Sequence, residues 1–216
     1  MSESIKVVLL GEAFVGKTCI INKFFSNEFN PNTTSNLSAQ YVTKKIEFED
    51  GKSLSFDIWD TIGQEKFRSL NKLFYQGAKA IILVYDITNK KSFNEMKDYW
   101  YKQIMELGNR DIILVIDENK NDLYEKRQVS SKEGEEFAKE KGAFFASTSA
   151  LNGNGIEELF ENIGRKILNP DFVIIDNEMN DDYKNEMKEN KKMEKSKSFR
   201  LNKIKDEKSK KKKSCC

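Results

Sequence analysis

The chain has 216 residues, enough for one ordinary domain and a remainder. Its 37 Lys and Arg nearly balance its 35 Asp and Glu, so the composition does not favour a nucleic-acid-binding protein. There is no His, which excludes His-dependent triads and His-ligated zinc or haem, and three Cys are too few for a disulfide framework and favour a reducing compartment.

Short apolar runs alternate with helical patterns over residues 1–168. The runs at residues 5–10, 81–85 and 112–116 are continuous, which is typical of strands that are covered on both faces. Such strands, separated by helices, predict a parallel sheet. No apolar run reaches the roughly 20 residues of a transmembrane helix.

One pair of strands is expected to run antiparallel. Residues 41–48 and 53–60 have strand-like composition and flank Asp50-Gly51, a dipeptide that favours a tight hairpin. We therefore expect a doubly wound, mostly parallel sheet of six strands with one antiparallel strand and about five flanking helices.

Two helix starts and one helix end can be predicted from local signals. Ser92 with Glu95, and Ser130 with Glu133, have the spacing of a capping box. An amphipathic pattern of apolar residues runs up to residue 168 and is followed by Pro170, so we expect a helix to end there.

A phosphate-binding motif follows the first strand-like run. It reads Gly-x-x-x-x-Gly-Lys-Thr and consists of Gly11, Glu12, Ala13, Phe14, Val15, Gly16, Lys17 and Thr18, with Cys19 next. Backbone N–H groups of such a loop face phosphates, the lysine reaches the β- and γ-phosphate oxygens, and the threonine hydroxyl binds Mg²⁺. Placement between a strand and a helix makes a chance glycine-rich turn a poor alternative. Phe14 is unusually bulky for this loop.

Two further motifs lie at the expected carboxyl ends of strands. Asp60 ends the second hairpin strand, where a carboxylate can hold Mg²⁺ beside Thr18. Asn119, Lys120 and Asp122 follow the run at 112–116. A carboxylate can accept the adjacent N1–H and N2–H donors of guanine, whereas adenine presents an acceptor at N1. Asp122 therefore favours GTP over ATP.

Over residues 5–168 the sequence resembles the Ras superfamily of small GTPases and, within it, the Rab family. The strings that carry the resemblance are Ile58-Trp59-Asp60-Thr61, Gly63-Gln64-Glu65, Phe67-Arg68-Ser69-Leu70, Phe74-Tyr75-Gln76-Gly77-Ala78 and Leu83-Val84-Tyr85-Asp86-Ile87-Thr88. The resemblance implies a P-loop G domain that binds GTP or GDP with Mg²⁺.

The resemblance also implies roles for individual residues. Phe29 would pack on the guanine, Lys120 would cover it, and Gln64 would orient the hydrolytic water, with Lys17 as its catalytic partner at the phosphates. The remaining nucleotide contacts that it implies are Gly63, Ser149, Ala150 and Leu151.

The sequence departs from the family at several of these positions. Asn36 stands where the family has the threonine that ligates Mg²⁺ and senses the γ-phosphate, so we expect Asn36 to take its place as a metal ligand or neighbouring hydroxyls to substitute for it. Ile62 replaces an alanine, Glu118 replaces the glycine before Asn119, and Leu151 replaces a lysine. None of these changes removes a phosphate ligand.

Residues 169–216 differ in composition from the preceding domain. They hold 14 Lys and Arg against 10 Asp and Glu and have few apolar side chains, so we expect a disordered tail. The tail carries the basic run 210–213 and ends in Cys215-Cys216, which matches the Rab pattern of double geranylgeranylation. The first residues lack a secretory signal, so we expect a cytoplasmic protein on the cytosolic face of endosomal or other vesicular membranes.

These observations favour a GTP-hydrolysing switch with a monomeric G domain. Its expected partners are an exchange factor, an activating protein, a GDP dissociation inhibitor or escort protein, effectors and a membrane, with no nucleic acid. A guanine-nucleotide-binding membrane adaptor that does not cycle is the alternative, motivated by Asn36. An ATP-dependent P-loop kinase is a third reading, against which Asp122 argues.

Overall fold

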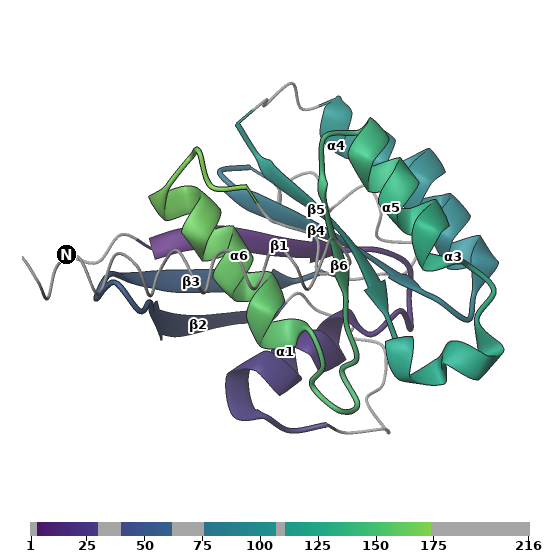
Figure 1. Cartoon of the computed structure of the whole chain (residues 1–216), viewed down its shortest axis with the longest axis horizontal. Coiled ribbons are helices and arrows are strands. Elements are labelled where there is room, and N and C mark those ends of the chain that lie inside the picture. The colour runs from purple at the N-terminus through teal and green to yellow at the C-terminus, as the bar shows by residue number, and fades with distance from the viewer. Residues whose placement is uncertain (1–3, 30–39, 62–75, 107–110, 174–216) are drawn as a thin grey trace, which may run out of the picture. The chain divides into compact units, whose positions relative to one another are not determined.

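A six-stranded sheet forms the centre of this computed structural model, which describes residues 4–29, 40–61, 76–106 and 111–173 (Figure 1). The strand order is β2-β3-β1-β4-β5-β6. The strands are β1 (Ser4–Leu10), β2 (Gln40–Glu47), β3 (Ser53–Asp60), β4 (Ala80–Asp86), β5 (Ile113–Asn119) and β6 (Phe144–Ser147). Only β2 pairs antiparallel with its neighbour, which confirms the predicted mostly parallel sheet with one antiparallel strand.

The parallel strands all end at the same edge of the sheet. Their last residues are Leu10, Asp60, Asp86, Asn119 and Ser147. The pairing register aligns Asp60 with Leu9 and Asp86 with Asn119, so side chains that are far apart in the sequence meet at this edge. In open α/β sheets, ligands bind at the carboxyl ends of the strands.

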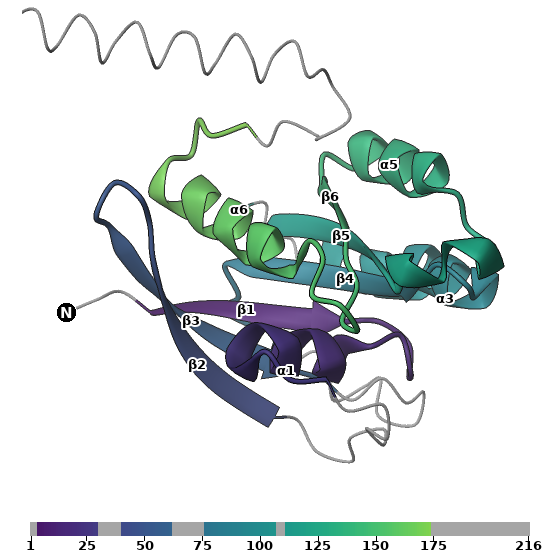
Figure 2. The ribbon, with the colours of Figure 1, turned by 60° about the horizontal axis from the view of Figure 1, so that its bottom comes forward.

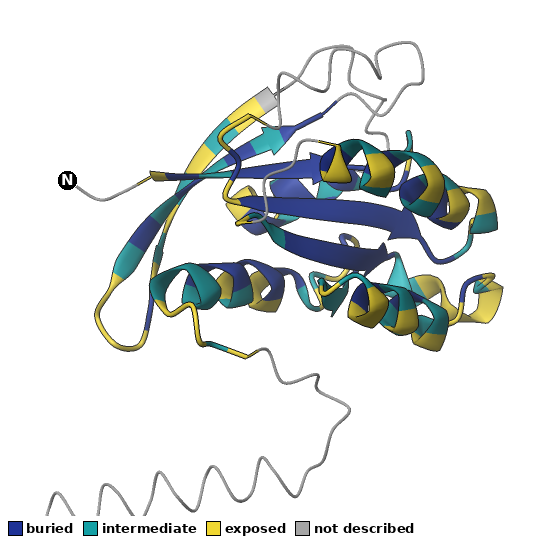
Figure 3. Ribbon diagram, turned by 90° about the horizontal axis from the view of Figure 1, so that it is seen from above, coloured by how far each residue is buried: buried dark blue, intermediate teal, exposed yellow. Residues whose placement is uncertain are grey.

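Helices cover both faces of the sheet in the part of the chain that is described. They are α1 (Lys17–Ser26), a continuous segment made of α3 (Lys90–Glu95), η2 (Met96–Tyr101) and α4 (Lys102–Met105), the short η3 (Asn121–Lys126), α5 (Ser131–Glu140) and α6 (Ile156–Leu168). Apolar side chains of α1 and α6 form one core, and those of the α3–α4 segment and α5 form another. The buried strands lie between these two layers (Figure 3). None of the described helices has both the length and the apolar character needed to cross a bilayer.

The predicted hairpin is confirmed. β2 and β3 pair along their whole length, and the hairpin turn extends to the left in Figure 2. Phe48 N–H donates to the carbonyl of Lys52 over 2.8 Å, and Gly51 takes a φ of +80°, which a residue without a Cβ adopts at little cost. The turn therefore needs the glycine that the sequence supplies.

Of the two predicted capping residues, one is correct and one is wrong. Ser130 caps α5, and its Oγ accepts a hydrogen bond from Glu133 N–H over 3.3 Å. Ser92, in contrast, lies inside α3, which begins two residues earlier at Lys90. Its N-cap is Asn89, whose Oδ1 accepts from Ser92 N–H. Ser92 Oγ instead donates to the carbonyl of Asn89 over 2.7 Å. An Asn side chain caps as well as a Ser side chain, and here it lies one turn closer to the strand.

The predicted helix end before Pro170 is also confirmed. α6 ends at Leu168, and its residues Ile156, Leu159, Phe160 and Ile163 are buried at helical spacing. Proline restricts the preceding residue to extended conformations, and Asn169 at the C-cap is extended, with φ −140° and ψ 98°.

Candidate functional site

The phosphate loop lies between β1 and α1, as the motif predicts. Gly16 caps α1 in the left-handed region with φ +103°, and a Cβ placed on it would lie 2.2 Å from Asn119 Nδ2. A Cβ on Gly11 would lie 2.3 Å from the carbonyl oxygen of Val84. Both glycines are therefore required for the loop to pack against β4 and β5, at the N-terminus of a helix that favours anions.

Lys17 is buried inside this loop. Its Nζ donates to the carbonyls of Gly11 and Glu12 over 2.9 and 2.8 Å. Burial lowers the pKa of Lys17 to about 8, while the charges of Asp60 and Glu12 act in the opposite direction. Trp100 Nε1 donates to Glu12 Oε1 over 3.1 Å, which ties the loop to η2. A nearby anion would favour the charged form of Lys17.

Thr18 and Asp60 come together at the loop, as the sequence analysis predicts. Thr18 Oγ1 donates to Asp60 Oδ2 over 2.6 Å. A hydroxyl and a carboxylate are hard oxygen donors of the kind that Mg²⁺ prefers, so the two residues fit that ion. Among the described residues no group of three or more Cys, Asp or Glu side chains gathers, so phosphate oxygens and water would supply the other ligands.

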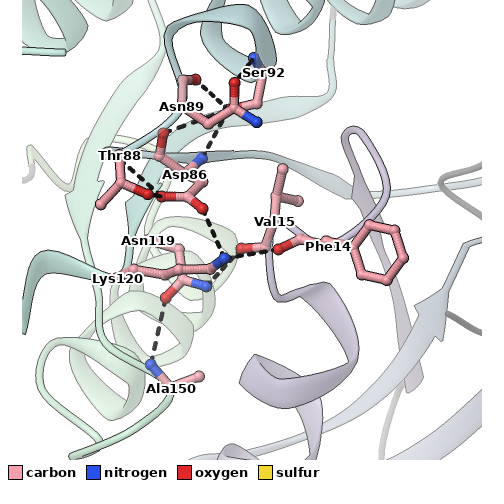
Figure 4. Close-up of polar contacts among 9 residues, drawn as sticks. All are labelled: Phe14, Val15, Asp86, Thr88, Asn89, Ser92, Asn119, Lys120 and Ala150. Carbon is pink, nitrogen blue, oxygen red and sulfur yellow. Dashed lines mark hydrogen bonds and ion pairs between the residues drawn. The ribbon is translucent and has the colours of Figure 1, made fainter. Parts of the chain in front are cut away.

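Asn119 connects the phosphate loop to the segments after β5 and β6. Its Nδ2 donates to the carbonyl of Val15 over 2.7 Å, and its Oδ1 accepts from Ala150 N–H over 3.3 Å (Figure 4). Thr148 Oγ1 also lies 3.3 Å from this oxygen. The amide of Asn119 thereby joins the end of β5 to the phosphate loop, more than a hundred residues earlier in the chain, and to the segment after β6.

Lys120 makes a second connection to the phosphate loop. Its Nζ donates to the carbonyl of Phe14 over 2.8 Å and pairs with Asp86 Oδ2 at 2.6 Å. Phe14 and Lys120 both take positive φ values, +64° and +67°, and the Phe14 ring is 74% exposed, pointing away from the Lys120–Asp86 pair (Figure 4). A bulky residue in this region is strained, so the hydrogen bond from Lys120 helps to hold it there.

The segment after β6 lies beside Asp122. Ser149 Oγ donates a hydrogen bond to Asp122 Oδ1, and Ser149 is buried. Leu151, in contrast, is 52% exposed, and Phe29 is half-buried against the core on the α1 and α6 side. The predicted base-reading residues Asn119, Lys120, Asp122, Ser149 and Ala150 are thus brought together, and the half-buried Cys19 lies in the first turn of α1.

Two adjacent acids at the end of β5 are buried on opposite sides of the sheet. Asp117 accepts from Thr148 Oγ1, and burial raises the pKa of Asp117 to about 8. Glu118 accepts from Arg127 at the end of η3. In the sequence, Glu118 stands out only because it replaces a glycine of the family, and no motif marks Asp86, Asp117 or Thr148. For the two acids, Asp86 and Asp117, a position at the end of a strand is the available signal.

Five predicted site residues lie outside the described part of the chain. They are Asn36, Gly63, Gln64, Cys215 and Cys216.

Comparisons with known proteins agree with this geometry. The model of the Ras family matches residues 6–169. The Ras-related protein Rab-8B of Homo sapiens is 41% identical over 163 residues, covering 76% of this chain and 78% of that protein. Rab-21 of Homo sapiens is 41% identical over 165 residues, covering 76% and 72%, and Rab-4 of Dictyostelium discoideum is 35% identical over 164 residues, covering 76% and 79%. The chain therefore belongs to the Ras family, as a divergent Rab-type small GTPase with a P-loop G domain.

Proposed function

We propose that this GTPase is a switch that binds GTP, hydrolyses it to GDP and phosphate, and regulates intracellular membrane and vesicle traffic. The observation that carries the proposal is the pair of hydrogen bonds from Asn119 and Lys120 to carbonyls of the phosphate loop, 2.7 and 2.8 Å long. These bonds join a phosphate-binding segment and a base-reading segment into one site, which supports a nucleoside triphosphate as the ligand.

The phosphate half of the site binds the triphosphate through α1 and its preceding loop. Backbone N–H groups at the helix N-terminus donate to phosphate oxygens. Lys17 Nζ exchanges the carbonyls of Gly11 and Glu12 for β- and γ-phosphate oxygens, which keeps it protonated in spite of its burial. Thr18 and Asp60 would hold Mg²⁺, which when bound neutralises charge that develops between the β- and γ-phosphates.

The base half of the site selects guanine. Asp122 accepts N1–H and N2–H of the base, with its carboxylate held by Ser149. Lys120 and Phe29 cover the two faces of the ring, and Ala150 N–H donates to the guanine oxygen; Leu151 follows at the rim. Adenine would leave Asp122 without donors, which costs more than a hydrogen bond gains.

Hydrolysis needs a water aligned on the γ-phosphate, a role that we assign to Gln64 beside Gly63. Asp122, Lys17 and Asp60 bind and position the nucleotide. Of the arginines in the described part of the chain, Arg127 pairs with Glu118 and Arg165 with Glu161, so neither is placed to stabilise the transition state. An arginine supplied by an activating protein increases the rate by roughly 10³ to 10⁵ in related enzymes. We therefore expect a slow intrinsic rate and dependence on such a protein.

The output of the switch is partner binding. The γ-phosphate would order residues 31–45 and 63–76, with Asn36 as a metal ligand, and effectors would recognise that state. An exchange factor would release GDP. We assign residues 1–168 to the GTPase domain and residues 169–216 to a membrane-anchoring tail, prenylated at Cys215 and Cys216 and carried between membranes by an escort protein or GDP dissociation inhibitor.

The test is to identify the nucleotide that co-purifies with the full chain and then to follow its single turnover with Mg²⁺. We expect GDP or GTP, with slow turnover that an activating protein accelerates. In Gln64→Leu we expect nucleotide binding to be unchanged while stimulated hydrolysis falls by roughly 10³-fold or more. Equal turnover in both proteins would contradict the role of Gln64. Bound GTP without turnover under any condition would support the non-cycling adaptor instead.

A further inference from the structure

Glu118 is a buried carboxylate, and both of its oxygens accept hydrogen bonds. It is 1% exposed, and four side chains donate five hydrogen bonds to it: Arg127 twice, at 2.7 and 3.1 Å, Ser131 at 2.9 Å, Ser147 at 2.8 Å and Tyr85 at 3.3 Å. A buried charge is costly unless it is paired and hydrogen-bonded, and this one is both. The forked pair with Arg127 also fixes the direction of both side chains.

The partners of Glu118 come from separate elements around the base-reading residues. Arg127 is the C-cap of η3, the helix that contains Asp122, and Ser131 is the first residue of α5. Ser147 is the last residue of β6, two positions before Ser149, and it lies opposite Glu118 in the pairing of β5 and β6. One carboxylate therefore holds η3, α5 and β6 at the carboxyl edge of the sheet.

The connection continues to the base-reading segment through Ser147. Its Oγ donates to Glu118 and accepts from Asn121 Nδ2 over 3.1 Å. Asn121 is the residue before Asp122, and its backbone N–H also donates to the carbonyl of Thr148 over 3.0 Å. Asp122 is thus bounded on one side by the Asn121–Ser147–Glu118 chain and on the other by Arg127 at the end of the same helix.

We propose that Glu118 is a positioning residue for guanine selection, which acts through Ser147 and Arg127 to hold the carboxylate of Asp122 against the segment Ser149-Ala150. The inference rests on the proposed recognition of guanine by Asp122. The family resemblance noted above has a glycine at this position, and a glycine has no side chain with which to join these elements. In this chain the carboxylate of Glu118 supplies that connection through Arg127, Ser131 and Ser147.

A comparison of GTP with ITP measures the alignment of Asp122. Guanine carries N1–H and N2–H donors, whereas hypoxanthine carries N1–H only, so the preference for GTP over ITP reports the second hydrogen bond to Asp122. A general loss of protein stability would weaken the binding of GTP and of ITP by the same factor. A shift of Asp122 that breaks its hydrogen bond to N2–H weakens the binding of GTP and leaves the binding of ITP nearly unchanged.

The experiment compares dissociation constants for GTP and ITP in four variants of the full chain. Ser147→Ala removes one hydroxyl and no charge, and Arg127→Gln removes the fork; in both we expect the preference for GTP to fall roughly tenfold, the worth of one hydrogen bond to a charged group. Ser147→Thr keeps the hydroxyl and should retain the preference. Lys90→Ala, which breaks an ion pair between α3 and α5 that involves neither Glu118 nor Asp122, is the control and should also retain it.

The possible outcomes distinguish a failure of the proposed function from a failure of the positioning role of Glu118. An unaltered protein that binds GTP, ITP and ATP equally would overturn the proposed function and this inference together. An unaltered protein that prefers GTP, with the same preference in Ser147→Ala and Arg127→Gln, would overturn the positioning role alone. If Arg127→Gln does not fold, Ser147→Ala decides, because its change is confined to one hydroxyl. A loss in Ser147→Ala that Ser147→Thr does not show would establish the role.

Discussion

The carboxylate of Asp122 accepts a hydrogen bond from the hydroxyl of Ser149. We expect Asp122→Asn to weaken GTP by roughly 10- to 100-fold and to shift the preference towards xanthine nucleotides. The reason is that the amide presents an N–H donor to the oxygen at C2 of xanthine, where guanine has an amino group. Competition of GTP and XTP against a fluorescent nucleotide measures the change. Asp98→Asn, at an exposed position on η2, is the control, and an unchanged ranking in Asp122→Asn would contradict the assignment.

The burial of Asp117 predicts how the stability of the fold changes with pH. Its pKa is raised to about 8 by burial, above the ordinary value of 3.8, so the folded state binds more protons than the unfolded state between those values. Its contribution to stability is present below about pH 4 and is lost as the pH rises through about 8. We expect Asp117→Asn to flatten the fall in stability between pH 5 and 8, as measured by urea unfolding with saturating GDP. A parallel pH profile in both proteins would show that Asp117 does not titrate in this range.

Polar residues that belong to a sequence motif can be predicted from the sequence, whereas polar residues that only the fold brings to the site cannot. Lys17, Thr18, Asp60 and Asp122 could be predicted because each motif has a chemical reason for its spacing. For Asp86 the sequence offers only its position at a strand end. Its pairing with Lys120 depends on the register that places it opposite Asn119, and register is a property of the assembled sheet.

At the scale of elements, α5 packs closely on β4 through Gly134. A Cβ at Gly134 would lie 2.4 Å from Tyr85 Oη and 2.7 Å from the Phe145 ring. Gly134→Ala gains about 1 kcal/mol of helix propensity, but overpacking of a filled core costs about 1 to 3 kcal/mol. We expect a net loss of up to about 2 kcal/mol in the free energy of unfolding, measured by urea titration. Lys139→Ala, exposed on the same helix, should stay within about 0.5 kcal/mol. A stabilised Gly134→Ala would contradict this packing.

The elements that the sequence predicts well are those with a long or strongly marked pattern. β1, β4 and β5 are nearly continuous apolar runs, and the hairpin carries Asp50-Gly51. No range could be assigned to β6, which has only four residues, all half-buried, so that alternation has no room to appear. η2 could not be predicted either, because a π-helical turn departs from the 3.6-residue period on which helix patterns rest.

We expect the domain to bind nucleotide and the tail, residues 169–216, to bind the membrane. Replacing Cys215 and Cys216 by Ser removes both sites for lipid, and each buried CH₂ of a lipid chain is worth about 0.8 kcal/mol. We expect the double variant to bind nucleotide normally and to leave the membrane fraction entirely. Neutralising residues 210–213 should only weaken or redirect membrane binding, because each lysine contributes about 1 kcal/mol at an anionic surface. Cell fractionation and microscopy measure both effects, and a double variant that stays on membranes would refute lipid anchoring.

The order of strands along the chain has a consequence for synthesis. The phosphate loop follows the first strand, whereas Ser149 and Ala150 follow β6, at the far edge of the sheet. Roughly 130 residues separate Thr18 from Ser149, which at ribosomal rates of about 5 to 20 residues per second is on the order of ten seconds. A nascent chain therefore carries the proposed phosphate ligands well before β6 pairs with β5 and completes the proposed guanine-binding site. Once β5 has been made and until β6 forms, the edge of β5 presents unpaired N–H and C=O groups.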